Sequence, residues 1–160
     1  AYELQSRLFR LGVRANAISD AHQQLFSAST LGEKGVAFVV SHVGRMPYTL
    51  DAVRYARAHG TTVVALTQAG TPLAEIADLV LAISAPQDPL RPVGTDIHLA
   101  HLTVIEILMV RLAQKLGPVA VHGLQQFKHL LHEHGFNSNA YANVVDSTGE
   151  AGDTPLGQLD

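Results

Sequence analysis

The sequence predicts an α/β fold in which helices cover both faces of a parallel sheet. Short runs rich in valine, leucine and alanine recur between residues 35 and 83, and each run is bounded by glycine or polar residues. Near-continuous apolar runs are typical of strands that are buried on both faces. Segments with helical periodicity separate the runs, and strands that alternate with helices indicate parallel pairing.

Size and composition indicate one ordinary globular domain. The chain has 160 residues, of which 47% are hydrophobic and 16% are charged. A formal net charge of −3 without a lysine or arginine run argues against nucleic-acid binding by this chain itself. The absence of cysteine excludes disulfides and thiolate metal sites and fits a cytoplasmic protein. The most apolar segment, residues 102–113, is too short and too polar to span a bilayer, so we expect no membrane contact.

The first elements follow from local signals. Leucines along one helical side and a closing glycine predict a helix over residues 1–10. No N-cap residue precedes this helix, so we expect that the chain begins inside an element. Residues 13–19 are predicted to form a short strand. Asp20 is then expected to cap a helix that runs to about residue 31 and ends at Gly32.

Two buried strands are expected next. Residues 35–41, "GVAFVVS", form a β-branched run that predicts a strand buried on both faces. Pro47 suits the first turn of the following helix, and Gly60 ends that helix. Residues 61–67, "TTVVALT", predict the second strand.

A short helix and a third strand complete the predicted sheet region. Thr71 is a suitable N-cap, with Pro72 at the first position of a helix that ends near Ala77. Residues 79–83 predict the third strand. Residues 84–94 contain three prolines and are expected to form a loop.

The C-terminal part is predicted to be helical and then irregular. Residues 95–116 are apolar nearly all round, so this helix must be buried on more than one side. We expect one side to pack on the sheet and another on a second subunit, in a homodimer or tetramer. A further amphipathic helix is expected over residues 119–134, and residues 135–160 have the composition of an irregular or partner-ordered tail.

The stretch "SHVGRMP", at the start of the first long connection, has the pattern of an anion site. A strand leads through a polar turn into a helix N-terminus, where backbone N–H groups and the helix dipole attract negative charge. Ser41 offers a hydroxyl, Gly44 allows a close backbone approach, and Arg45 can pair with a phosphate. In the simpler alternative, Gly44 only makes the connection and Ser41 caps the next helix.

The order of the motifs resembles the SIS (sugar isomerase) domain over roughly residues 1–116. The version it resembles most is the effector-binding domain of RpiR/MurR-type bacterial transcription regulators. The matching motifs are Ser41 with Gly44, Ala56 with Gly60, Thr67, Thr71-Pro72-Leu73-Ala74 and Ala77-Asp78.

The resemblance implies a flavodoxin-like three-layer α/β/α fold that binds a phosphosugar at the C-terminal ends of its strands. It implies a SIS domain over residues 1–134 and an upstream helix-turn-helix domain, absent here, through which alone DNA would be bound. The first strand, with its Gly-x-Gly-x-Ser loop, also looks missing from this chain. No cofactor or metal is implied. The expected ligand-binding residues are Ser41, His42, Val43, Gly44, Arg45, Met46, Thr67, Asp96 and His98.

The turn departs from the family pattern at two positions. Val43 and Met46 stand where the family has hydroxyl side chains. Each lost hydrogen bond to a charged group costs about 1.5–3 kcal/mol. Either the backbone and Arg45 compensate, or the ligand differs, or the site has degenerated.

Three functions are therefore weighed. The first is a phosphosugar sensor that dimerises and transmits ligand occupancy to a DNA-binding domain. The second is a phosphosugar ketose–aldose isomerase, for which Glu106 and His98 are weak candidates for acid–base catalysis. The third is a dimerisation module with a degenerate site. For His98 and His101, three residues apart on one helix, the simplest interpretation is a partly buried position at a dimer seam.

Overall fold

A computed structural model describes residues 1–84 and 95–136 of the chain. In these residues the helices are α1 (Tyr2–Arg10), α2 (Ala21–Leu31), α3 (Pro47–Ala58), α4 (Pro72–Ile76), α5 (Thr95–Leu116) and α6 (Pro118–Glu133), and the strands are β1 (Val36–Val40), β2 (Thr62–Thr67) and β3 (Leu79–Ala82). No helix in this described part is long and apolar enough to cross a membrane.

The sheet is parallel, as predicted, and its strand order is β1-β2-β3. Val36 pairs with Thr62, and Val64 pairs with Leu79. All three strands therefore end at the same edge of the sheet. The turns that follow β1 and β2 both lie at this edge, which is where the sequence places the candidate site.

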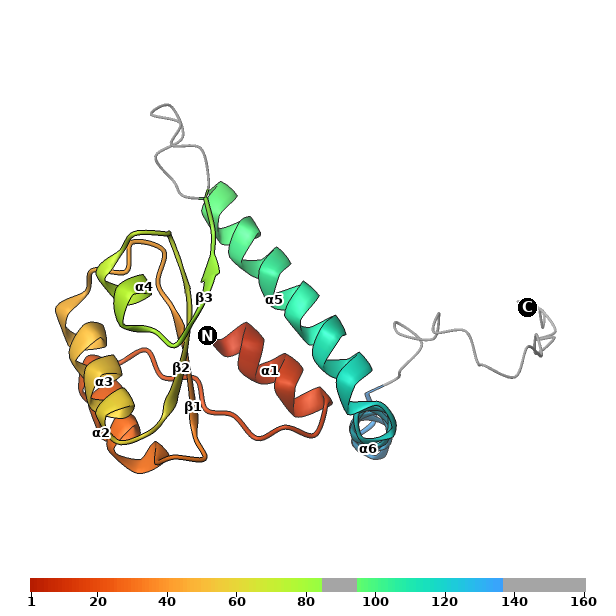
Figure 1. Cartoon of the computed structure of the whole chain (residues 1–160). Coiled ribbons are helices and arrows are strands. Elements are labelled where there is room, and N and C mark those ends of the chain that lie inside the picture. Colours follow the sequence, from red (N-terminus) through yellow and green to blue (C-terminus); the bar gives the residue numbers. More distant parts are fainter. Residues whose placement is uncertain (85–94, 137–160) are drawn as a thin grey trace, which may run out of the picture.

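Two helical layers cover the sheet, and the three-layer prediction is confirmed. Helices α2, α3 and α4 lie on one side of the strands, and α1 and α5 lie on the other (Figure 1). Side chains of β1 alternate between the two cores. Phe38 and Val40 pack with the α1, α5 and α6 side chains, whereas Ala37 and Val39 pack with those of α3 and α4. This alternation decides which way the residues of the next turn point.

The burial of the strands differs from the prediction. Only β2 has the buried side chains expected of a strand covered on both faces, with Val63 and Leu66 completely inaccessible. The β1 strand is mostly half-buried, and Val36 at its start is 59% exposed. The reason is position, because β1 and β3 are the edge strands of the described sheet.

The predicted strand over residues 13–19 is wrong. This segment has no regular structure and joins α1 to α2. A strand needs a neighbour to receive its backbone hydrogen bonds, and the described sheet has none beside this segment. The N–H of Val13 instead donates to the Leu8 carbonyl, and the N–H of Ala17 donates to the Gln5 side chain.

The helix boundaries agree with the local signals. Asp20 caps α2, as predicted, because its carboxylate accepts a hydrogen bond of 2.9 Å from the N–H of Gln23. The long helix spans the predicted residues. It buries Ile105 and Met109 against α1 and the sheet and exposes other apolar side chains, among them Leu99, Ile107 and Val110. The predicted contact of this helix with a second subunit stays a prediction, and residues 85–94 and 137–160, where a loop and a tail are expected, lie outside the described residues.

Candidate functional site

The turn from β1 to α3, residues 41–46, is fixed to the end of β2. The N–H of Ser41 donates to the Leu66 carbonyl at 3.1 Å, which extends the strand pairing by one residue. The carbonyl of His42 accepts from the N–H of Gln68 at 3.0 Å and from the hydroxyl of Thr67 at 3.2 Å. These bonds hold the turn rigidly at the sheet edge, so its amides have defined directions.

Gly44 is required at the centre of the turn for two reasons. Its φ of 59° lies in the left-handed region that side chains with a Cβ disfavour. A Cβ on Gly44 would also stand 2.5 Å from the Thr71 hydroxyl and 2.7 Å from the Thr67 hydroxyl. The Gly44 carbonyl accepts from the N–H of Leu73 at 3.1 Å, so the turn is packed against the start of α4.

Helix α3 starts without a side-chain cap. Its N-cap residue is Met46, which has no hydrogen-bonding group for the first-turn amides. The N–H of Gly44 donates to the Ser41 hydroxyl at 3.3 Å. By contrast, several other N–H groups around this turn have no protein acceptor within the described chain, among them those of Val43, Arg45, Met46, Tyr48 and Thr49.

The side chains around these amides form a mixed rim. Arg45 is exposed and has no ion-pair partner among the described residues. Val43, Met46 and Tyr48 are 58%, 60% and 66% exposed. The site thus combines unpaired backbone donors and one cation with an apolar border. An anion can bind the donors, and a less polar part of the same molecule can contact the border.

Beneath the turn, His42 contacts His101 of α5. The ring centroids are 5.7 Å apart, and the rings meet edge to face at 64°. The Nδ1 atom of His42 and the Nε2 atom of His101 are both buried and have no hydrogen-bond partner in the described residues. Burial lowers the pKa of His101, and the neighbouring rings of His42 and His98 lower it further. His101 therefore makes a ring contact within this chain, and its place at a dimer seam stays a prediction.

The other expected site residues are distributed less closely. Thr67 is fully buried, and its hydroxyl supports the turn from below through His42 and Thr71. Asp96 and His98 are exposed at the start of α5. Glu106 lies further along α5 and forms an ion pair with Arg7 of α1. The structure thus gathers the turn residues and His101 but gives Glu106 a partner on another helix.

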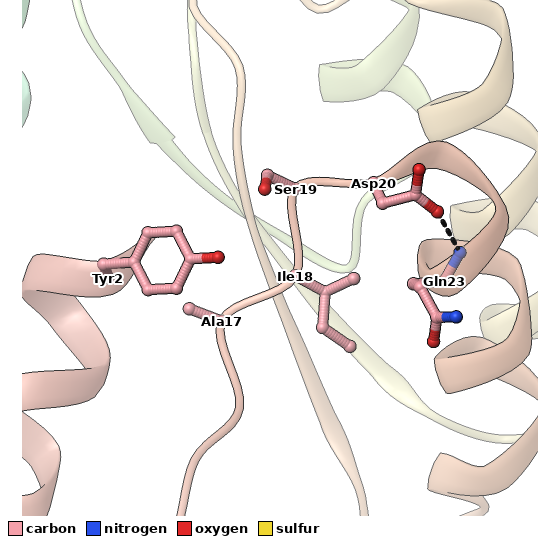
Figure 2. A pocket seen from close by; sticks show the side chains of 6 residues that line it. All are labelled: Tyr2, Ala17, Ile18, Ser19, Asp20 and Gln23. Atoms are coloured by element: carbon pink, nitrogen blue, oxygen red, sulfur yellow. Dashed lines mark hydrogen bonds between the residues drawn. The ribbon is translucent and has the colours of Figure 1, made fainter.

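A hollow with a volume of about 200 Å³ lies at the start of α2. Its lining residues are Tyr2, Ala17, Ile18, Ser19, Asp20 and Gln23 (Figure 2). Figure 2 shows the Asp20 carboxylate bonded to the backbone of Gln23, so this helix end already holds a negative charge. An anion is therefore repelled here, and the α3 end is the better anion site of the two.

Comparison with known proteins places this geometry in context. The SIS domain family profile matches residues 1–111. The HTH-type transcriptional regulator RpiR of Escherichia coli is 34% identical over 113 residues, which is 70% of this chain and 38% of that protein. The HTH-type transcriptional regulator HexR of the same species is 31% identical over 143 residues, which is 86% of this chain and 47% of that protein. The chain thus spans less than half the length of these curated relatives.

Solved structures agree on the fold. The Vibrio vulnificus NanR protein complexed with ManNAc-6P superposes with a TM-score of 0.76 at 24% identity, covering 85% of this chain and 52% of NanR. The sugar isomerase domain of an RpiR transcription factor from Sphaerobacter thermophilus gives a TM-score of 0.65 at 24% identity, covering 80% of this chain and 70% of that one. These likenesses support the same α/β architecture.

Proposed function

The chain belongs to the SIS domain family, and on this basis we propose that it is the effector domain of a transcription regulator. In this proposal the domain binds a phosphorylated sugar or a related anionic metabolite. Its ligand occupancy is transmitted to a helix-turn-helix DNA-binding domain that is not in this sequence. The HTH-type regulators among its relatives support this assignment.

The observation that carries the proposal is the uncapped N-terminus of α3. Several amides around the turn have no protein acceptor among the described residues, and the Arg45 side chain of the same turn is exposed. Backbone N–H groups at a helix N-terminus bind phosphate through hydrogen bonds and the helix dipole. These donors belong to the backbone, so they are present although Val43 and Met46 lack hydroxyl groups.

The route from the ligand to a second subunit passes through α5. His42 in the turn contacts His101 on α5, so a ligand at the turn acts on this helix directly. The same helix exposes Leu99, Ile107 and Val110, which are suited to a dimer interface. A ligand that favours one arrangement of the two subunits would shift their population and so change DNA binding. Such a regulator acts in the cytoplasm.

The contacts support sensing over catalysis. An isomerase needs a base beside the substrate carbon that loses its proton. Glu106 is instead paired with Arg7 on α1, and His98 is exposed at the start of α5. In the turn itself, the Ser41 hydroxyl and the exposed Arg45 guanidinium suit anion binding.

A thermal-shift screen tests the proposal. The whole chain is heated with glucose 6-phosphate, ribose 5-phosphate and N-acetylmannosamine 6-phosphate, with the unphosphorylated sugars as matched controls. A ligand at about 100 times its Kd adds about 2.7 kcal/mol to the free energy of unfolding. We expect a higher Tm with at least one phosphate and none with the free sugars. If no phosphate raises the Tm, the effector function is wrong. Exchange of a substrate proton with deuterated water would favour the isomerase instead.

A further inference from the structure

The contact between His42 and His101 leaves two ring nitrogens unexplained. Both atoms are buried, and neither has a hydrogen-bond partner in the part of the chain that the structure describes. Buried polar atoms are nearly always satisfied, because leaving one unpaired costs about 1–3 kcal/mol. Two unpaired nitrogens in one ring contact therefore indicate a group with a role beyond packing.

The position of His42 follows from β1. Phe38 and Val40 point to the α5 side of the sheet, and His42 continues that alternation two residues later. Its ring accordingly lies under the turn and meets His101. The next residue along the chain is Val43, whose amide is one of the free donors of the anion site. The ring pair and the anion site thus share one turn, with His42 in the pair and Val43 in the site.

The surroundings of His101 favour its neutral ring when the site is empty. Burial is the main reason why the pKa of His101 is lowered, and His42, His98 and the amine of Ala1 act in the same direction. Farther along α5, Glu106 is paired with Arg7 of α1. A bound anion changes this balance, because a negative charge close to a poorly hydrated imidazole favours its protonated form.

We propose that His42 and His101 form a proton-binding pair that matches the charge of the bound anion, with His101 as a ligand-site residue supplied by α5. When the anion binds the turn, the pair takes up one proton, which the buffered solvent supplies, and holds it on a ring nitrogen. No other bond forms or breaks. This inference rests on the proposed function, because it requires an anion at the α3 N-terminus.

This coupling sets the direction in which the affinity for the anion depends on pH. Binding raises the pKa of the pair, so protonation and binding support each other. Affinity for the anion is therefore highest at low pH. It falls as the pH rises, by about tenfold for each pH unit between the pKa of the empty pair and that of the occupied pair.

Histidine NMR of the whole chain tests the inference with inorganic sulfate as the probe, because the charge of sulfate does not change near neutral pH. The ring nitrogen shifts are followed from about pH 6 to pH 8, with excess sulfate and with chloride at matched ionic strength. We expect sulfate to raise the pKa of His101 by about one unit or more, a tenfold change in proton affinity. His129, which lies beside Glu133 on α6, is the internal control and stays unchanged.

The amide signals separate the two possible failures. If sulfate shifts the Val43 and Arg45 amides but leaves both histidines unchanged, the proton-binding pair is wrong and the anion site stands. If neither the amides nor the histidines respond, both ideas fail.

A variant gives a second, independent test. His101→Gln keeps a neutral polar side chain but cannot be protonated, so its affinity for sulfate should lose most of its pH dependence. His129→Gln is the matched control and should retain that dependence. A His101→Gln variant with the full pH dependence of the unmodified chain would overturn the proposal.

Discussion

The turns that follow β1 and β2 both connect a strand end to a helix start, but they differ in how that helix start is capped. Both leave parallel strands at one edge of the sheet, and both enter a helix through a proline in the first turn. At the start of α4, the Thr71 hydroxyl accepts from the N–H of Ala74 at 3.2 Å and so caps its own helix. At the start of α3, the corresponding residue is Met46, which caps nothing.

The difference shows how the chain divides stability and binding between similar elements. A side-chain cap stabilises a helix by about 1 kcal/mol. The α4 turn has this stabilisation, and its Thr71 also packs against Gly44. The α3 turn lacks it and keeps its amides free. A capping side chain would occupy amides that a ligand can bind. We therefore interpret the missing cap as stability that α3 forgoes so that its N-terminus stays open to a ligand.

The largest expected effect comes from a methyl group at the centre of the open turn. Gly44→Ala would strain a left-handed backbone and press its Cβ against Thr71 and Thr67. We expect a loss of about 2–4 kcal/mol in the free energy of unfolding, measured by urea denaturation. Gly70→Ala, in the capped turn, is the matched control. Its φ is 68° but nothing lies within 4 Å of the added Cβ, so it should cost about 1–2 kcal/mol. Equal losses would show that the close approach at Gly44 is unimportant.

A carboxylate at the open helix end should stabilise the fold and weaken anion binding. Met46→Asp places a capping group where α3 has none, so the free energy of unfolding should rise by about 1 kcal/mol. The same carboxylate occupies the free amides and repels an anion, and the Kd for sulfate or a sugar phosphate should rise on the order of a hundredfold. Calorimetry and urea denaturation measure the two effects. Met46→Asn, the neutral control, should stabilise the helix with a smaller loss of affinity. Unchanged binding by Met46→Asp would place the anion elsewhere.

Removal of the existing cap tests the other turn. Thr71→Ala deletes the hydroxyl that accepts from Ala74 and bonds to Thr67. We expect the free energy of unfolding to fall by about 1–2 kcal/mol in urea denaturation. Met46→Ala has no cap to lose and should change stability by only a few tenths of that amount. Similar losses in both variants would mean that the two helix ends are equivalent.

The smallest effect concerns charge alone. Arg45→Gln removes an exposed cation beside the free amides, and we expect the Kd for a sugar phosphate to rise about three- to tenfold at low salt. The difference should shrink as salt is added, and stability should stay the same. Arg54→Gln on α3, whose side chain already pairs with Asp51, is the control. An equal change in both variants would indicate a general charge effect.

Local rules predicted the parts of the fold that depend on neighbours in sequence. Asp20 and Thr71 cap the expected helices, and Pro47 starts α3, because capping and proline effects act within one turn. Residues 13–19 were predicted wrongly because a strand depends on a partner that is distant in sequence. The burial of β1 was overestimated for the same reason.

The candidate site was predicted in its backbone but only partly in its side chains. The glycine turn and the helix start were visible in the sequence, and so was the apolar Met46 in place of a hydroxyl side chain, although its position as the N-cap of α3 was not predicted. The contact between His42 and His101 joins residues 59 positions apart, and helical or strand periodicity alone cannot pair them. The signal that could have found it is the alternation along β1, which sends His42 toward the long apolar helix.

The exposed margin of the sheet affects how the isolated chain must be handled. Along β1, one row of peptide groups has no partner among the described residues, and the adjoining side chains are valine, alanine and phenylalanine. A margin of this kind accepts a strand from any molecule that approaches it. Concentrated solutions of this chain should therefore form assemblies by strand addition, and a lysine at Val36 is the change that should keep the molecules apart.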